Sequence, residues 1–118
     1  MNQISLIGRL TADPELRQTQ NGTPVASFTL AVDRPRVKGT TDFFSCVAWR
    51  QVGEFICQYF AKGRKMGITG TMQSRKYEKD GQTRTVWEVI VDQVDFCDNK
   101  KENRSDFEEF EDDGELPF

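Results

Sequence analysis

The stretch Asp42-Phe43-Phe44-Ser45-Cys46-Val47-Ala48-Trp49 decides the fold of this chain. Its aromatic and β-preferring residues predict a strand, along which successive side chains point to opposite faces. If Cys46 and Ala48 face a core, Phe43 and Trp49 stand outside it. Apolar residues follow at helical spacing from Val52 to Phe60, and they predict one amphipathic helix directly after the strand.

Weaker strand patterns lie on both sides of this strand and helix. They predict strands at 4–10, 25–32, 66–72 and 86–96. A hairpin is expected over 75–84, with its turn at Asp80-Gly81, and Asn21-Gly22 marks another turn. The order of the main elements is therefore β-β-β-α-β-β in about 100 residues. A sheet of short strands avoids exposed edges by closing, so we predict an all-β fold, a small closed barrel.

Single residues add detail to this prediction. Lys62-Gly63 is expected to end the helix, with a cation in the last turn and a glycine able to take a positive φ. Gly70 interrupts the alternation of its strand and is a candidate bulge. Trp87 has the same strand parity as two nearby valines, so we expect it in the core.

The charge is divided unevenly along the chain. Residues 1–104 hold sixteen basic and twelve acidic side chains, a net charge of +4, whereas residues 105–118 hold seven acidic and no basic ones. A mildly basic body joined to an acidic tail suggests that the body meets a polyanion. The tail has too few apolar residues to offset its ordering entropy, which predicts disorder.

The chain finishes with the residues Asp112-Asp113-Gly114-Glu115-Leu116-Pro117-Phe118. An aromatic side chain with a free carboxylate, stiffened by proline and approached by acids, suits a partner pocket with a hydrophobic floor and a basic rim. The alternative is an acidic tail that only increases solubility, because such tails are common.

Several classes of function are disfavoured. The sequence has no histidine, no Gly-rich phosphate loop and no nucleophile elbow, so we expect no enzyme. Cys46, Cys57 and Cys97 form no C-x-x-C pair; we expect no metal and no cofactor, and interpret all three as small buried apolar residues. No apolar stretch approaches the roughly 18 residues that span a membrane, and the start does not resemble a secretory signal. We therefore expect a cytoplasmic protein that does not meet a membrane.

Aromatic residues beside cations are candidates for binding single-stranded nucleic acid, whose bases stack on rings while cations meet phosphates. Phe43 and Trp49 would stand outside the core near Arg50, and Tyr77 lies in the hairpin among the cations Arg75, Lys76, Lys79 and Arg84. From spacing alone, Phe43, Trp49 and Tyr77 fit packing in a core or a dimer interface as well as they fit binding of nucleic acid. The loop cations Arg34, Arg36 and Lys38 fit either a solvated loop or a DNA clamp.

These features resemble bacterial single-stranded DNA-binding proteins of the homotetrameric type that serves replication and repair. The similarity covers nearly the whole chain. The matching segments are Asn2 to Leu10, Asp13-Pro14-Glu15-Leu16-Arg17, Asn21-Gly22, Val25-Ala26, Phe28-Thr29-Leu30-Ala31-Val32, Asp42-Phe43 to Trp49, Tyr59-Phe60-Ala61-Lys62-Gly63, Gly70, Arg75-Lys76-Tyr77, Glu88-Val89 and the acidic Leu-Pro-Phe end. Body and tip are physically unrelated, so a match in both is specific.

The resemblance implies an OB-fold, a five-stranded Greek-key barrel with one helix between strands 3 and 4. It implies that the bases stack on Phe43, Trp49 and Tyr77. We assign contacts with phosphates to eight basic residues: Arg9, Arg17, Arg34, Arg36, Arg50, Arg75, Lys76 and Arg84. The resemblance further implies a homotetramer around which DNA is wrapped. The tip that would recruit replication, recombination and repair proteins consists of Asp112, Asp113, Glu115, Leu116, Pro117 and Phe118.

We therefore expect residues 1–98 to form an OB-fold domain that binds single-stranded DNA without sequence preference. Residues 99–118 are expected to form a disordered acidic tail with a protein-interaction tip. The protein would be cytoplasmic and associated with the nucleoid. Two alternatives stay open: an RNA-binding or primosome-type protein of the same fold, and an adaptor whose OB surface binds only protein. Stacking serves DNA and RNA alike, so these residues do not separate the two.

Overall fold

Six strands and one helix make up residues 1–97, the part of the chain that the computed structural model describes. The strands are β1 (Ile4–Leu10), β2 (Glu15–Gln18), β3 (Pro24–Asp33), β4 (Thr41–Trp49), β5 (Lys65–Lys79) and β6 (Gln82–Phe96). The helix α1 (Arg50–Tyr59) connects β4 to β5. The predicted tail and its tip, residues 99–118, lie outside the described residues.

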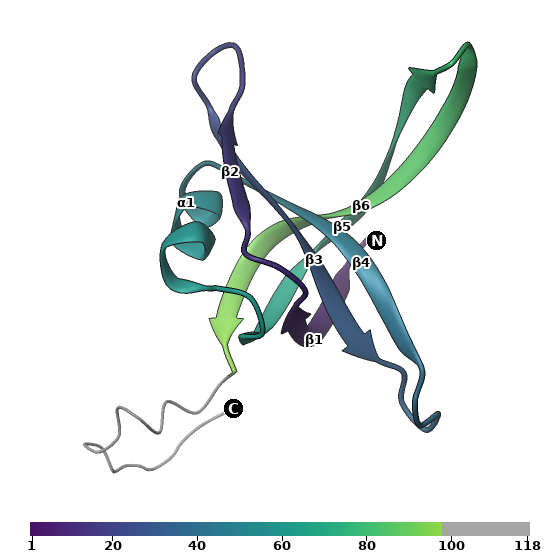
Figure 1. Cartoon of the computed structure of the whole chain (residues 1–118). Coiled ribbons are helices and arrows are strands. Elements are labelled where there is room, and N and C mark those ends of the chain that lie inside the picture. Colours follow the sequence, from purple (N-terminus) through teal and green to yellow (C-terminus); the bar gives the residue numbers. More distant parts are fainter. Residues whose placement is uncertain (98–118) are drawn as a thin grey trace.

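Five of these strands close into a barrel. Hydrogen-bonded neighbours run in the order β1-β5-β6-β4-β3, and β3 returns to β1 at Arg9↔Ala31 and Leu10↔Leu30 (Figure 1). The neighbours pair antiparallel except for β4 and β6, which run parallel at Cys46↔Val89. The predicted OB-fold is thereby confirmed, with its helix between the third and fourth barrel strands. β2 lies outside the ring and pairs with β3.

Alternation along the strands decides which residues fill the barrel. Of the two sides of β4, the one that carries Cys46 and Ala48 is buried. The other strands contribute the buried side chains Leu10, Ala26, Phe28, Leu30, Met66, Ile68, Val89 and Val91. From α1, Ile56 is fully buried against this interior. Just after α1, the ring of Phe60 stacks on Phe96 with 4.8 Å between centroids. The helix and this aromatic pair therefore cover one part of the core.

The helix ends earlier than predicted. α1 stops at Tyr59, and Phe60 caps it in an extended conformation while donating its N–H to the carbonyl of Ile56 at 2.9 Å. Lys62 therefore lies beyond the last turn, and the prediction of a cation there is wrong. Gly63 does take a positive φ, +85°, but it belongs to the turn that leads into β5.

The strands also differ from the prediction in two ways. β2 was not predicted, because its four residues are all exposed and show no apolar alternation. The strands predicted at 66–72 and 86–96 continue into the arms of the hairpin, so β5 and β6 each contain 15 residues. Their turn is the predicted one: Asp80 and Gly81 have φ of 53° and 77°, as a tight hairpin turn requires.

Two predictions of burial are wrong. Trp87 is 60% exposed, although its parity with the buried Val89 and Val91 holds. The reason is that the hairpin projects beyond the barrel, where the inward side of β6 no longer meets the core (Figure 1). Of the cysteines, Cys46 is buried, and desolvation raises the pKa of its thiol to about 12, but Cys57 and Cys97 are only partly buried.

Gly70 allows β5 to pass close to β6. The register shifts between Thr69 and Gly70, as the predicted bulge requires, and a Cβ at Gly70 would overlap the carbonyl of Ile90. Gly70→Ala should therefore lower the free energy of unfolding by about 1–3 kcal/mol in a urea titration. Gly67→Ala is the control, because its Cβ would meet only side-chain atoms, the nearest being Cys97 Sγ at 3.2 Å. Equal losses in both variants would contradict this account.

Candidate nucleic-acid interface

Phe43 and Trp49 lie on the outer face of β4. Because Cys46 and Ala48 face the core, the residues of opposite parity point outward. Phe43 is 65% exposed and Trp49 43% exposed. On β3, Ala31 is paired with Phe43 and Val25 with Trp49. These neighbours are smaller than the rings beside them, so part of each ring surface stays open to a ligand.

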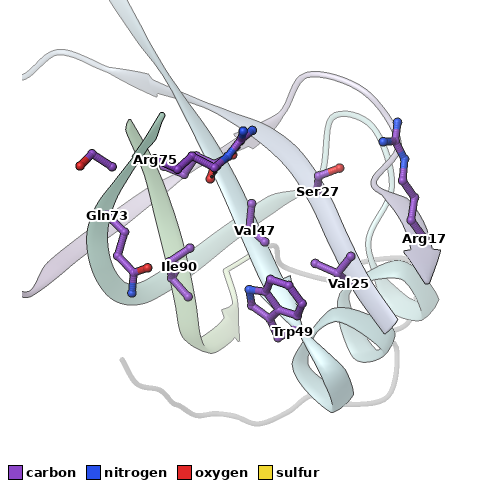
Figure 2. Close-up of a pocket in the computed structure, with 10 residues that line it drawn as sticks. Arg17, Val25, Ser27, Val47, Trp49, Gln73, Arg75 and Ile90 are labelled. Carbon is purple, nitrogen blue, oxygen red and sulfur yellow. Dashed lines mark hydrogen bonds and ion pairs between the residues drawn. The ribbon is translucent and has the colours of Figure 1, made fainter. Parts of the chain in front are cut away.

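An open groove of about 390 Å³ separates this face of the barrel from the base of the hairpin. Its lining residues come from five strands: Arg17, Val25, Ser27, Val47, Trp49, Gln73, Ser74, Arg75, Glu88 and Ile90. Figure 2 shows Arg17 and Arg75 on opposite sides of the groove, with Val47 and Trp49 between them. An aromatic ring on an apolar floor with cations at the sides is an arrangement suited to bases and phosphates.

The hairpin adds a second ring beside this groove. Tyr77, which is 37% exposed, is paired across the hairpin with Arg84. The guanidinium carbon of Arg75 lies 5.9 Å from the centre of the Tyr77 ring. By strand alternation Arg75, Tyr77 and Arg84 face one side of the hairpin, whereas Lys76 faces the other. In the sequence these residues form one cluster, but the structure places Lys76 on a different face of the hairpin from the other three.

Three of the predicted phosphate contacts are already engaged with carboxylates. Arg34 donates two hydrogen bonds to Asp42, at 3.2 and 2.7 Å. Arg75 donates two to Glu88, at 3.1 and 3.3 Å. Arg17 donates one to Glu15, at 3.0 Å. The bond from Arg34 holds the pKa of Asp42 below its usual value, so this pair persists through neutral pH. A phosphate would have to compete with these carboxylates.

Glu88 was not predicted as part of the site. It lines the groove with a side chain that is only 16% exposed, and it is the carboxylate partner of Arg75. Across the hairpin, Glu88 is paired with Gln73 and Arg75 with Val86, so the two charges are diagonal neighbours. Only the register of β5 on β6 brings them together, and sequence spacing did not provide it.

Three further arginines that were predicted to contact phosphates do not line the groove. Arg50 follows Trp49 directly and has a left-handed backbone, with φ of 57°, which turns the chain from β4 into α1. Arg36 has φ of 68° in the exposed loop between β3 and β4. Arg9 donates to the carbonyl of Gly63 at 3.0 Å and does not line the groove. The roles of these three arginines stay predictions.

Comparison with known proteins agrees with this geometry. The family model described as the single-strand binding protein family matches residues 1–97. The chain belongs to this family. The match to the single-strand binding protein family covers the barrel, α1 and the hairpin together.

Named relatives support the same assignment. The chain is 48% identical over 101 residues to the single-stranded DNA-binding protein of Clostridium perfringens, a match that covers 84% of this chain and 67% of the relative. It is 43% identical over 105 residues to that of Oceanobacillus iheyensis, covering 85% and 65%. For Fusobacterium nucleatum the identity is 43% over 106 residues, covering 85% and 69%. The chain thus spans about two thirds of the length of these members of the single-strand binding protein family.

Residues 1–97 contain no group of three or more His, Cys, Asp or Glu side chains placed to hold a metal ion. Within this range, α1 is too short to cross a membrane.

Neutralising Glu88 tests the electrostatics of the groove. Glu88→Gln removes an anion from the proposed path of DNA and releases Arg75, so we expect about two- to fivefold tighter binding of oligo-dT. The slope of log affinity against log salt should become steeper by up to about 0.7, the value for one more neutralised phosphate. Fluorescence titrations at several salt concentrations measure both effects.

The matched control is Asp92→Asn, which removes the same charge from β6 but outside the groove lining. If the two variants changed affinity equally, the effect would come from net charge and the role given to Glu88 would be wrong.

Proposed function

We propose that this chain binds single-stranded DNA without sequence preference and protects it during replication, recombination and repair, without enzymatic activity. The observation that carries the proposal is the groove in which Trp49 lies between Arg17 and Arg75. The names of the relatives, single-stranded DNA-binding proteins, support the same ligand.

The exposed rings provide the physical basis. Phe43, Trp49 and Tyr77 present ring surface on which a base can stack, each stack contributing about 1–3 kcal/mol. Every base has such a face, so stacking tolerates any sequence. In a duplex the faces are already covered by neighbouring bases, so the same rings favour a single strand. Cations beside the rings, such as Arg84, attract the phosphates between successive bases.

Two other ligands would use the same surface differently. An RNA-binding or primosome-type protein of this fold would stack bases on the same rings, and competition between oligo-U and oligo-dT measures that preference. A protein-only adaptor would leave the emission of Trp49 unchanged when oligo-dT is added. The groove favours nucleic acid over protein, because cations flank its ring on two sides.

Self-assembly into a homotetramer is a second part of the proposal. Ile7 and Phe96 are exposed large hydrophobic residues. They lie beside a hollow lined mainly by apolar residues of β1, β5 and β6, and this hollow shares no lining residue with the groove of Trp49. A chain of this size leaves such a surface exposed at a cost, which contact with another copy would remove.

The acidic tip is the third part. We propose that residues 112–118 recruit other genome-maintenance proteins, with Phe118 filling an apolar pocket and Asp112, Asp113 and Glu115 attracting its basic rim. The support is the composition of this segment, which combines acidic residues with a single aromatic plug.

Removing the rings one at a time tests the binding mode. Phe43→Ala, Trp49→Ala and Tyr77→Ala should each weaken binding of oligo-dT by about 1–3 kcal/mol while leaving the melting temperature nearly unchanged, because all three rings are exposed. Tyr59→Ala removes an exposed ring of α1 outside the groove and is the control. Wild-type affinity in all three variants would disprove the stacking assignment, and unfolding would show that the rings act in packing.

The assembly is tested by light scattering. We expect a particle of about four times 13.6 kDa for the unchanged chain. Ile7→Glu should reduce this mass, because it places a charge on the proposed contact surface. Val37→Glu changes another exposed apolar residue, in the loop between β3 and β4, and should leave the mass unchanged. A monomer at micromolar concentration, without any substitution, would overturn the tetramer.

The tip is tested with peptides. A peptide of residues 110–118 should bind partner proteins and compete with the full chain for them, whereas the same peptide without Phe118 should bind at least tenfold more weakly, as loss of a buried anchor implies. Deleting Phe118 from the full chain should leave the affinity for oligo-dT unchanged. Equal binding by the two peptides would eliminate the role proposed for Phe118.

A further inference from the structure

Trp87 lies on the side of the β5–β6 hairpin opposite to Arg75 and Glu88, and of the hairpin residues on its side only Ser74 also lines the groove. The register of the two strands is continuous from Gly70↔Val91 to Lys79↔Gln82, so the two sides of the hairpin are defined by alternation. One side carries Arg75, Tyr77, Arg84 and Glu88. The opposite side carries Ser74, Lys76, Thr85 and Trp87. Trp87 is 60% exposed and does not line the groove.

The surroundings of Trp87 on that side are polar and cationic toward the turn and apolar toward the barrel, where the next pair is Met72 and Val89. Ser74 is paired with Trp87, and Lys76 and Thr85 form the next pair on this side toward the turn. Lys76 is therefore a diagonal neighbour of Trp87, within reach of a long side chain. Glu78 lies one pair further away, opposite Thr83. Within residues 1–97, Lys76 takes part in no ion pair.

This combination repeats the chemistry of the other side. There, Tyr77 provides a ring and Arg75 the cation beside it. Here, Trp87 provides the ring and Lys76 the cation. A stable contact with another protein would bury about 800 Å² of surface per partner around an apolar centre. Toward the barrel Trp87 is followed by the partly buried Met72 and the buried Val89, and toward the turn by polar residues and Lys76, so its exposed indole offers a single flat face beside a cation, which suits a base followed by a phosphate.

We propose that Trp87 is a further stacking site for single-stranded DNA. A strand that leaves the groove passes around the edge of the hairpin, places a base on the indole of Trp87 and a phosphate on Lys76, and so engages both sides of the hairpin. The inference rests on the proposed function. It assigns Lys76, which faces away from the groove, to the outer part of the same path.

The chain contains two tryptophans, so each can be observed separately. Trp49→Phe keeps a ring in the groove and leaves Trp87 as the sole emitter, whereas Trp87→Phe leaves Trp49. Both variants are titrated with oligo-dT of increasing length at low salt. Short oligonucleotides should quench Trp49 only, and longer ones should quench both. Lys76→Gln in the Trp49→Phe background should weaken the quenching of Trp87, and Glu78→Gln, the matched control, should not.

Affinity provides a second readout. Trp87→Ala should weaken binding of a long oligo-dT by about tenfold and leave the affinity for a short one unchanged, since one stack is lost only where the strand reaches it. Trp87→Phe, which keeps an aromatic face, should retain most of the affinity for the long oligonucleotide.

The outcomes separate this inference from the function on which it rests. If Trp49 is quenched and Trp87 keeps its emission at every length, the further site is wrong and the proposed function stands. If neither is quenched, the proposed function itself fails. If Trp87 emission changes when the protein is diluted without DNA and not when DNA is added, Trp87 contacts a second copy of the chain, and this too overturns the inference.

Discussion

The parallel pairing of β4 with β6 is the contact on which the rest of the structure depends. It consists of two residue pairs, Cys46↔Val89 and Val47↔Ile90, and it joins β3 and β4 to β1, β5 and β6, so that the return of β3 to β1 can close the barrel. Cys46 and Val89 are buried on its inner side, while Val47 and Ile90 line the groove on its outer side. Because closure places the hairpin beside the outer face of β4, one backbone contact supports both the core and the proposed binding surface.

The proposed site combines open rings with restrained cations. Arg34 and Arg75 each hold a carboxylate in two hydrogen bonds, so their guanidinium groups are oriented before any ligand arrives. A phosphate gains less from a paired arginine than from an unpaired one, since it must replace a carboxylate that is already bound. We therefore expect stacking to contribute the larger share of affinity. This balance suits a protein that must cover any sequence and release it again, because exposed ion pairs exchange readily with salt and with other partners.

Strand and helix patterns were sufficient to predict the barrel. Alternation placed Phe43 and Trp49 on one side of the strand and Cys46 and Ala48 on the other, but it did not say which side faces the core; the resemblance favoured exposed rings and supplied the OB-fold. The same parity argument misplaced Trp87, because alternation gives the side of a strand and not whether another layer covers that side. Residue spacing also did not predict that Glu88 is part of the site, because its contact with Arg75 depends on the hairpin register. The four exposed residues of β2, of which only Leu16 is apolar, gave no alternation that indicated a strand.

The most direct test of the account is a crystal structure of the chain with oligo-dT bound. The account predicts bases stacked on Phe43, Trp49 and Tyr77, with the backbone of the strand following the groove between Arg17 and Arg75. DNA bound to another face of the barrel, or a strand in the groove that leaves all three rings uncovered, would contradict it.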